Sequence, residues 1–281
     1  FIKDILTLLR ECALDGLDLD WEFPAWQSDK YERVHFTQLL MEIREELERR
    51  HSKLILSVAV AAPQPIIDAS YDVSYMAQYV DYVNVMTYDF HFYTTYLPMT
   101  GYNAPLYKSA NETGYFATLN TNWSISYWQS KGMPKEKIVV GLPTYGHSFT
   151  LINENNHGNG APASGFGTFG DKGFISYPEA CRFVSEGSDC VFDRDSRVPY
   201  AFKGTEWISY DDEKSLAYKA WYVLNGSYGG AMIWSLNMDD FKGECSTTDQ
   251  KWFPLITKVK MVLEDNSLQE IEMRLTKALN I

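Results

Sequence analysis

The chain contains the stretch DGLDLDWE at residues 15–22, and its fold is organised around this stretch. Acidic and apolar residues alternate in it, and a β-strand sends successive side chains to opposite faces. One face of the expected strand then carries three carboxylates: Asp18, Asp20 and Glu22. The other carries Leu17, Leu19 and Trp21, and these large apolar residues lead us to expect burial on both sides of the strand.

Three neighbouring carboxylates repel one another, so this face needs a cation, a retained proton or a substrate. A solvated acidic strand is the plain alternative. A calcium loop of the EF-hand type requires Gly at its sixth position, and counting from Asp18 that position is Phe23. Crowding raises the pKa of a carboxyl group, which can then act as a general acid. Glu22 stands last, at the end of the strand where α/β sheets and barrels bind ligands.

The composition limits the classes of function. The 281 residues suffice for one large core or two modest ones, and the formal charge is −12. Such a charge argues against binding to nucleic acid or to anionic membranes. The sequence contains no run of about 20 apolar residues, so we expect no segment that spans a bilayer. Aromatic residues make up 15%, which suits either stacking on sugar rings or a large core.

The cysteines and sequons bear on the compartment. Four cysteines are too few to decide it, but three sequons, at Asn111, Asn122 and Asn225, favour a secreted glycoprotein. The chain opens directly in a helical pattern with no visible signal peptide, so we expect that a segment has been lost upstream. The sequence shows no metal-ligand spacing and no phosphate-binding loop, and we expect neither a metal nor a cofactor.

Hydrophobic periodicity predicts alternating strands and helices, which is typical of a parallel sheet with βα units. The expected strands span residues 15–22, 54–62, 82–90, 138–145 and 230–236. The expected helices span residues 1–12, 31–50, 75–79, 124–131, 216–224 and 252–263. The tail after residue 264 is charged and Leu-rich and can form a helix.

Between residues 146 and 211 this rhythm breaks. About 60 residues are too many for a βα loop, so we expect an inserted subdomain with a helical turn near residues 179–184 and strands near Trp207. A disordered loop is the alternative, and the aromatic residues and two cysteines of the segment favour order.

The chain resembles the family-eighteen glycoside hydrolases, the chitinases, up to about Leu263. Residues 15–22 match the family signature Asp-x-x-Asp-x-Asp-x-Glu. Three further stretches resemble family strands: MTYD at Met86–Asp89, GLPTYGH at Gly141–His147 and GGAMIWS at Gly229–Ser235. Plain core packing is the alternative for Tyr88, Tyr145 and Trp234.

The resemblance implies an eight-stranded βα barrel, of which the chain carries the last five strands and an inserted α+β subdomain. The implied domains are barrel segments at residues 1–146 and 211–265, the inserted domain at 147–210, and a tail at 266–281. A half-barrel exposes two sheet edges, so we expect a monomer only for the full-length protein. The resemblance also implies a disulfide between Cys181 and Cys245, whereas Cys12 and Cys190 have no family partner.

The implied mechanism is substrate-assisted and retaining. Glu22 protonates the glycosidic oxygen, the N-acetyl group of the substrate attacks the anomeric carbon, and Asp20 stabilises the oxazolinium ion while Asp18 shares a proton with Asp20. Tyr88 binds the acetamido group. The other implied substrate-binding residues are Asp89, Tyr145, Met86, His147 and Trp234, the last forming the floor under the distorted sugar.

Two positions depart from the family pattern. Many relatives continue Gly-x-Trp after residue 91, whereas this chain has FYTTY at residues 92–96, so that Tyr93 or Tyr96 would have to replace the Trp. His147 stands where relatives carry Arg or His, which would make binding more sensitive to pH.

Three hypotheses remain open from the sequence. The first is a secreted, endo-acting chitinase, which the intact Asp18-Asp20-Glu22 set favours. The second is a non-catalytic chitin-binding or growth-factor-like protein, which the absence of three strands favours for this chain by itself. The third is an endoglycosidase that acts on N-glycans.

Overall fold

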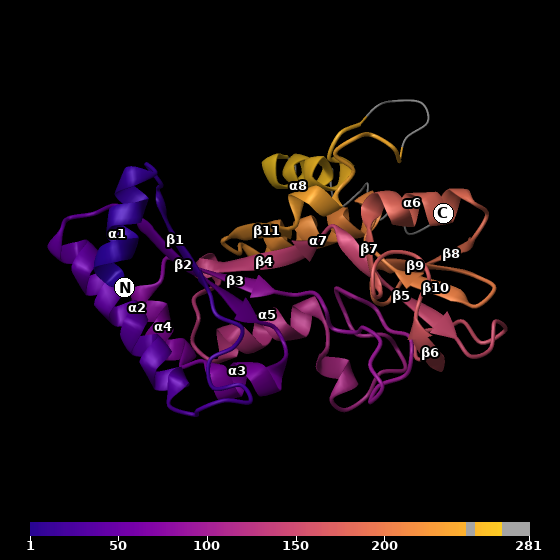
Figure 1. Cartoon of the computed structure of the whole chain (residues 1–281), viewed down its shortest axis with the longest axis horizontal. Coiled ribbons are helices and arrows are strands. Elements are labelled where there is room, and N and C mark those ends of the chain that lie inside the picture. The colour runs from indigo at the N-terminus through magenta and orange to yellow at the C-terminus, as the bar shows by residue number, and fades with distance from the viewer. Residues whose placement is uncertain (246–250, 266–281) are drawn as a thin grey trace. The chain divides into compact units, whose positions relative to one another are not determined.

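The structure is a computed structural model that describes residues 1–245 and 251–265 (Figure 1). It divides the chain into two compact units, which are described separately. The first unit comprises residues 1–86, 124–140 and 227–230. The second comprises the remaining residues.

The first unit is built on parallel strands. β1 (Gly16–Asp20), β2 (Ile55–Ala61), β3 (Tyr82–Met86) and β4 (Ile138–Pro143) pair in this order, and β11 (Gly230–Trp234) follows β4. The last three residues of β4 and all of β11 except Gly230 are assigned to the second unit. The pairs β1–β2, β2–β3 and β3–β4 are parallel. Val58, Val60, Val83 and Val85 are inaccessible to solvent, as expected for strands covered on both faces. All five expected strands are present, each two to four residues shorter than expected.

Helices α1 (Ile2–Glu11), α2 (Glu32–Arg49), α3 (Gln64–Ser70), α4 (Val73–Tyr79) and α5 (Thr121–Ser130) accompany these strands. α2 and α4 lie side by side (Figure 1). The buried residues of α2 repeat at helical spacing: Phe36, Leu40, Ile43 and Leu47. On the same helix, Arg44 donates from Nη2 to Asp81 Oδ2 at 2.7 Å and from Nε to the carbonyl oxygen of Tyr79 at 2.6 Å. Apolar packing and this ion pair together fix the helix.

The expectation of burial on both sides of β1 is wrong. Leu17 and Leu19 are only partly buried, Trp21 is 39% exposed, and Asp18 and Asp20 are exposed. The reason is the position of β1 at the end of the strand order, where β2 is its single pairing partner among the described strands.

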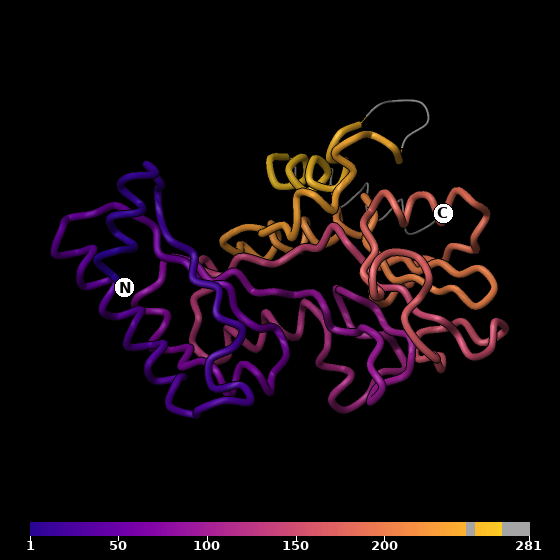
Figure 2. Tube along the Cα trace, in the orientation of Figure 1, coloured from indigo at the N-terminus to yellow at the C-terminus, as the bar shows by residue number. Residues whose placement is uncertain are grey.

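The second unit contains an antiparallel sheet. β6 (Ala163–Phe166), β5 (Tyr145–Leu151), β10 (Glu206–Ser209), β9 (Val198–Lys203) and β8 (Asp189–Asp193) follow one another, and β7 (Phe174–Ser176) also pairs with β5. The trace of this segment turns back on itself repeatedly (Figure 2). Trp207 and Phe149 are inaccessible and stack edge to face at 5.4 Å, in a core that also includes Tyr102. The segment is therefore ordered, with α6 (Tyr177–Ser185) and β10 where we expected a helical turn and a strand.

α7 (Glu213–Gly226) and α8 (Pro254–Glu264) complete the second unit and pack against each other. Asp239 is inaccessible and accepts hydrogen bonds from the backbone of Leu255 and Ile256 at the start of α8. It thereby satisfies two of the N–H groups that a helix start leaves unpaired. The helix expected in the tail after residue 264 lies outside the described residues apart from its first position.

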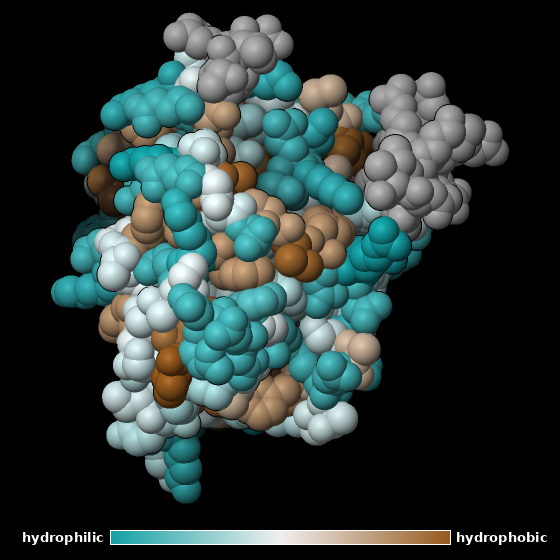
Figure 3. Space-filling view, turned by 90° about the vertical axis from the view of Figure 1, so that its right-hand side faces the viewer, coloured by the Kyte–Doolittle hydropathy of each residue, from teal (hydrophilic) through white to brown (hydrophobic). Residues whose placement is uncertain are grey.

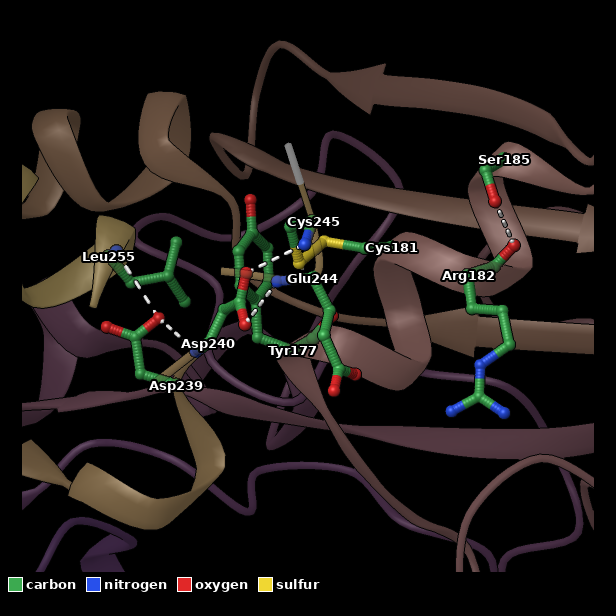
Figure 4. The surroundings of a disulfide bond; sticks show 9 residues. All are labelled: Tyr177, Cys181, Arg182, Ser185, Asp239, Asp240, Glu244, Cys245 and Leu255. Carbon is green, nitrogen blue, oxygen red and sulfur yellow. Dashed lines mark hydrogen bonds between the residues drawn. A yellow bond between two sulfur atoms is a disulfide. The ribbon is translucent and has the colours of Figure 1, made fainter. Parts of the chain in front are cut away.

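The disulfide implied by the resemblance is present: Cys181 on α6 is bonded to Cys245, with 5.4 Å between their Cα atoms. Asp240 fixes the loop that carries Cys245 (Figure 4). Its two carboxylate oxygens accept from the backbone N–H groups of Glu244 at 2.9 Å and Cys245 at 2.7 Å. Cys12 and Cys190 are free and exposed, in agreement with the lack of a family partner.

Two observations concern contact with a membrane: how hydrophobic residues are distributed on the surface, and how long and apolar the described helices are. On the face toward the right-hand side of Figure 1, hydrophobic residues occur in small groups among hydrophilic ones (Figure 3). Among the described helices, none combines the length and the apolar character that crossing a bilayer requires.

Candidate active site

The acidic face of β1 is anchored by two neighbouring strands of the first unit. Asp18 Oδ1 accepts hydrogen bonds from Ser57 Oγ at 2.6 Å and from Asn84 Nδ2 at 2.8 Å. In the register of β1 and β2, Asp18 pairs with Ser57 and Asp20 pairs with Ala59. In the register of β2 and β3, Ala59 pairs with Asn84. Both partners are donors, so they stabilise Asp18 as a carboxylate in one fixed position.

Asp20 lies in a different environment on the same face. Partial burial, and then the charge of Asp18, raise the pKa of Asp20 above its usual range. The buried phenol of Tyr71 is close enough for the charges of Glu22 and Asp20 to raise its pKa further, after burial itself. The Tyr71 oxygen accepts a hydrogen bond from the backbone of Ala61 at 3.2 Å. The site thus favours retention of a proton on Asp20.

Glu22 lies two residues beyond the end of β1 and is exposed. The adjacent Trp21 packs edge to face on the buried ring of Phe36 at 5.9 Å, which ties this loop to α2. Glu32, in the first turn of α2, accepts from the backbone of Ala25 at 2.9 Å. The side chain of Glu22 therefore stands on a loop that contacts α2 at two points.

We expect replacement of Asp20 by Asn to stabilise the protein at neutral pH and not at acid pH. A carboxyl group with a raised folded-state pKa favours folding below its unfolded-state pKa and loses this advantage as the pH rises through the folded-state pKa. Asn carries no charge, so the melting temperature of Asp20→Asn relative to the wild type should rise between pH 3 and pH 7. Asp15→Asn, on the exposed approach to the same strand, is the control and should show no such rise. If the melting temperature of Asp20→Asn differed from that of the wild type by the same amount at every pH, this would contradict a raised pKa of Asp20.

In the second unit, Asp89 gathers two further candidate residues. Its Oδ1 accepts from Tyr145 Oη at 2.7 Å and lies 2.7 Å from Nε2 of His147. His147 is buried, and its Nδ1 lies 3.3 Å from the carbonyl oxygen of Gly173. The side chain of Asp89 is 40% exposed, so it links a buried pair to the surface. A carboxylate, a phenol and an imidazole at one point can bind hydroxyl and amide groups.

Asn103 holds this group in place and was missed by the sequence analysis. It is inaccessible to solvent and uses every hydrogen-bonding group that it has. Its side chain accepts from the backbone of Asp89 at 2.9 Å and donates to the carbonyl oxygen of Tyr145 at 3.0 Å. Its backbone donates to Ser209 Oγ at 2.9 Å and accepts from Phe90 at 3.0 Å. Asp89 has a positive φ of 57°, and the Asn103 contact stabilises this conformation.

We expect Asn103→Asp to weaken both the fold and the binding of a chitooligosaccharide. The new oxygen would face the carbonyl oxygen of Tyr145, and a buried polar group without a partner costs about 1–3 kcal/mol. Thermal unfolding and calorimetric titration measure the two effects. Asn156→Asp, at an exposed position in the same unit, is the matched control. Unchanged stability and affinity in Asn103→Asp would show that the group around Asp89 does not depend on Asn103.

The remaining candidates lie as follows. Tyr88 is 8% exposed, stacks edge to face on Tyr145 at 5.9 Å, and points its hydroxyl at Met232 Sδ, 3.8 Å away. Trp234 ends β11 and is 55% exposed, and its carbonyl oxygen accepts from the backbone of Thr144 at 3.0 Å. Met86 ends β3 and is partly buried. The ring of Trp234, exposed at the end of its strand, is available for stacking on a ligand.

Tyr93 and Tyr96, expected to replace the family Trp, differ in their surroundings. The hydroxyl of Tyr93 donates to the carbonyl oxygen of Ser164 at 3.0 Å, and its ring packs on Phe166 at 5.4 Å. Tyr96 is 96% exposed. Of the two, Tyr96 presents the more exposed ring.

The structure thus joins Asp89, Tyr145, His147 and Tyr88 in one group of the second unit, and the acidic residues at β1 form another in the first. No contact described above joins Met86, Tyr93 or Trp234 to either group. Ser57, Asn84, Tyr71 and Asn103 were missed. For Ser57 and Asn84 a signal existed, because each is a polar residue within an otherwise apolar parallel strand. Convergence of the two groups on one cleft stays a prediction.

Comparisons with known proteins identify the family. Residues 1–239 match the model of glycosyl hydrolases family 18. The chain is 40% identical over 272 residues to chitinase-3-like protein 2 of Homo sapiens, covering 94% of this chain and 68% of the relative. It is 39% identical to chitotriosidase-1 of Mus musculus, of which it spans 57%.

Solved structures agree with this assignment. Human YKL-39, described as a pseudo-chitinase with retained chitooligosaccharide binding, superposes with a TM-score of 0.88 at 40% identity, over 94% of this chain and 73% of that one. An immunomodulatory active chitinase from Trichuris suis superposes with a TM-score of 0.87 at 37% identity, over 94% and 73%. The chain therefore belongs to glycosyl hydrolase family 18. Its mixed α/β fold is consistent with the barrel type of that family.

Proposed function

We propose that this protein hydrolyses β-1,4-linked N-acetylglucosamine polymers by a substrate-assisted, retaining mechanism. The observation that carries the proposal is the intact acidic set at the end of β1, with Asp18 held by Ser57 and Asn84 and the pKa of Asp20 raised. A carboxyl group that retains a proton, next to a carboxyl group fixed by two donors, supports a role for this row beside a developing cation.

In this mechanism Glu22 delivers its proton to the glycosidic oxygen as the bond to the anomeric carbon breaks. The acetamido oxygen of the same sugar forms the new bond to that carbon, and water later opens the resulting oxazolinium ion. Asp20 accepts a hydrogen bond from the nitrogen of this ion, and Asp18 orients Asp20. No metal or cofactor takes part in these steps.

The group around Asp89 supplies binding. Tyr88 contacts the acetamido group, Asp89 and Tyr145 bind hydroxyl groups, and Trp234 stacks on a sugar face. The exposed fractions of Asp89 and Trp234 support this division of roles. Met86, His147 and Tyr93 complete the proposed binding residues. The proposal requires both groups to act on one substrate.

We also propose that the parallel strands correspond to the last five strands of the family barrel, and that residues 147–210 form its inserted domain. The antiparallel order of β5 to β10 supports the second correspondence. Secretion is part of the proposal, supported by the disulfide, which persists in oxidising compartments. A monomeric full-length protein remains our proposal as well.

A non-catalytic oligosaccharide-binding protein is the second candidate function. It is favoured by the similarity to human YKL-39, whose description combines loss of chitinase activity with retained binding. The two candidates differ in turnover and share binding.

The deciding experiment measures the release of reducing ends from a chitooligosaccharide, together with its affinity by calorimetry. Turnover that disappears in Glu22→Gln establishes the hydrolase. Binding without turnover establishes the second candidate, and the absence of both overturns the two together.

A further inference from the structure

A cavity with polar and aromatic walls lies in the second unit. Its volume is about 490 Å³, within the range of small-ligand sites. Its walls come from three segments: residues 91–116, 158–160 and 191–200. Nothing in the proposed hydrolysis uses this cavity.

Hydrogen bonds fix the polar wall of the cavity. Glu112 accepts from the backbone of Ser109 at 2.9 Å and from Asn159 Nδ2 at 3.1 Å. Asp193 accepts from Tyr102 Oη at 2.8 Å and from Ser109 Oγ at 3.3 Å. The wall is therefore formed before a ligand arrives, which reduces the ordering that binding requires.

A second wall is aromatic. Phe116 is 37% exposed and stacks on the buried ring of His91 at 6.0 Å, with 19° between the ring planes. Burial lowers the pKa of His91 to about 4, so the ring behind Phe116 is uncharged at neutral pH. The charged residues that line the cavity are acidic: Glu112, Asp193 and Asp195. A cavity lined by an aromatic ring and by carboxylate and amide groups, with no Lys or Arg among its lining residues, suits a neutral ligand rich in hydroxyl and amide groups.

Asn111 lines the same cavity, is exposed, and opens the sequon Asn111-Glu112-Thr113. We propose that Asn111 carries an N-linked glycan and that the cavity receives its first N-acetylglucosamine, stacked on Phe116. In the attachment, Asn111 Nδ2 loses a proton and bonds to the anomeric carbon of a lipid-pyrophosphate-linked oligosaccharide, and the lipid pyrophosphate leaves. The site rests on the proposed secretion and is independent of the proposed hydrolysis.

The other two sequons do not line this cavity. Asn122 lies half-buried in the first turn of α5, and Ser124 of that sequon is inaccessible. Asn225 is exposed near the end of α7. Of the three sequons, Asn111 is the one that the polar and aromatic walls of this cavity can serve.

For the test, the chain is expressed in a eukaryotic host with an added N-terminal signal peptide, so that it is secreted. The result then does not depend on where the natural protein is located. Peptide mapping with glycosidase treatment measures the occupancy of Asn111. The glycan is then trimmed to one N-acetylglucosamine, and we expect the protein to melt about 2–4 °C higher than Asn111→Gln. Hydrogen exchange of residues 158–160 should slow in the trimmed protein relative to Asn111→Gln.

Phe116→Ala is the decisive variant, and Tyr115→Ala, a neighbouring exposed ring that does not line the cavity, is its matched control. The difference in melting temperature between the trimmed protein and its Asn111→Gln counterpart should vanish in the Phe116→Ala background. It should persist in the Tyr115→Ala background. An unoccupied Asn111, or a glycan that changes neither the exchange of residues 158–160 nor melting in a Phe116-dependent way, overturns the proposal.

Discussion

Glu22→Gln should reduce turnover of a chitooligosaccharide by at least about 10²-fold while leaving its affinity within about threefold of the wild type. Gln keeps the size and hydrogen-bonding shape of Glu but cannot deliver a proton. General acid catalysis typically supplies about 10²–10⁴-fold, and an alkoxide is a poor leaving group that needs the upper part of this range.

Binding should survive because we propose that it depends on other residues. In that proposal Trp234 and the group around Asp89 provide stacking and hydrogen bonds, and none of the contacts described for them involves Glu22. Turnover by steady-state assay and affinity by calorimetry must be measured on the same preparations.

Asp20→Ala provides the contrast. It removes the partner of the oxazolinium ion, so that turnover and the binding of the distorted sugar should both suffer. If Glu22→Gln kept more than about a tenth of the wild-type turnover, the proton donor would have to be another residue.

Removal of the disulfide should have the largest effect on stability. Cys181 and Cys245 are 64 residues apart, and closing such a loop lowers the entropy of the unfolded chain. In the chain-entropy model this corresponds to roughly 4 kcal/mol of the free energy of unfolding. The Cys181→Ser/Cys245→Ser double variant should therefore unfold at a clearly lower urea concentration.

The two free cysteines supply the matched control. Cys12→Ser/Cys190→Ser changes the same number of thiols at exposed positions, and surface substitutions usually change stability by less than about 0.5 kcal/mol. Reduction of the wild-type protein should reproduce the loss seen in the first double variant. Equal urea midpoints for the two double variants would contradict the structural role of the disulfide.

The sequence by itself determined the strands and the acidic motif. A long apolar run such as residues 54–62 is typical of a strand that is covered on both faces. The positions of such strands could therefore be predicted from the order of apolar residues along the chain. The alternation at residues 15–22 predicted one row of Asp18, Asp20 and Glu22, of which Asp18 and Asp20 lie in β1 and Glu22 lies two residues beyond its end. The family resemblance implied the Cys181–Cys245 pair, which the structure contains.

The register of the strands decided what the acidic row contacts. Ser57 and Asn84 reach Asp18 only because β2 and β3 pair in one particular alignment, and a shift by one residue would turn both side chains to the other face. The partial exposure of β1 likewise follows from its place at the end of the strand order, which local sequence does not encode.

Long-range packing decided the binding group. Asn103 contacts Tyr145 and Ser209, which lie 42 and 106 residues further along the chain, and it supports Asp89 at a positive φ. Nothing near Asn103 in the sequence marks it, because its partners are backbone atoms and a hydroxyl that any residue pattern could supply. Such a residue is found only when the tertiary structure brings the segments together.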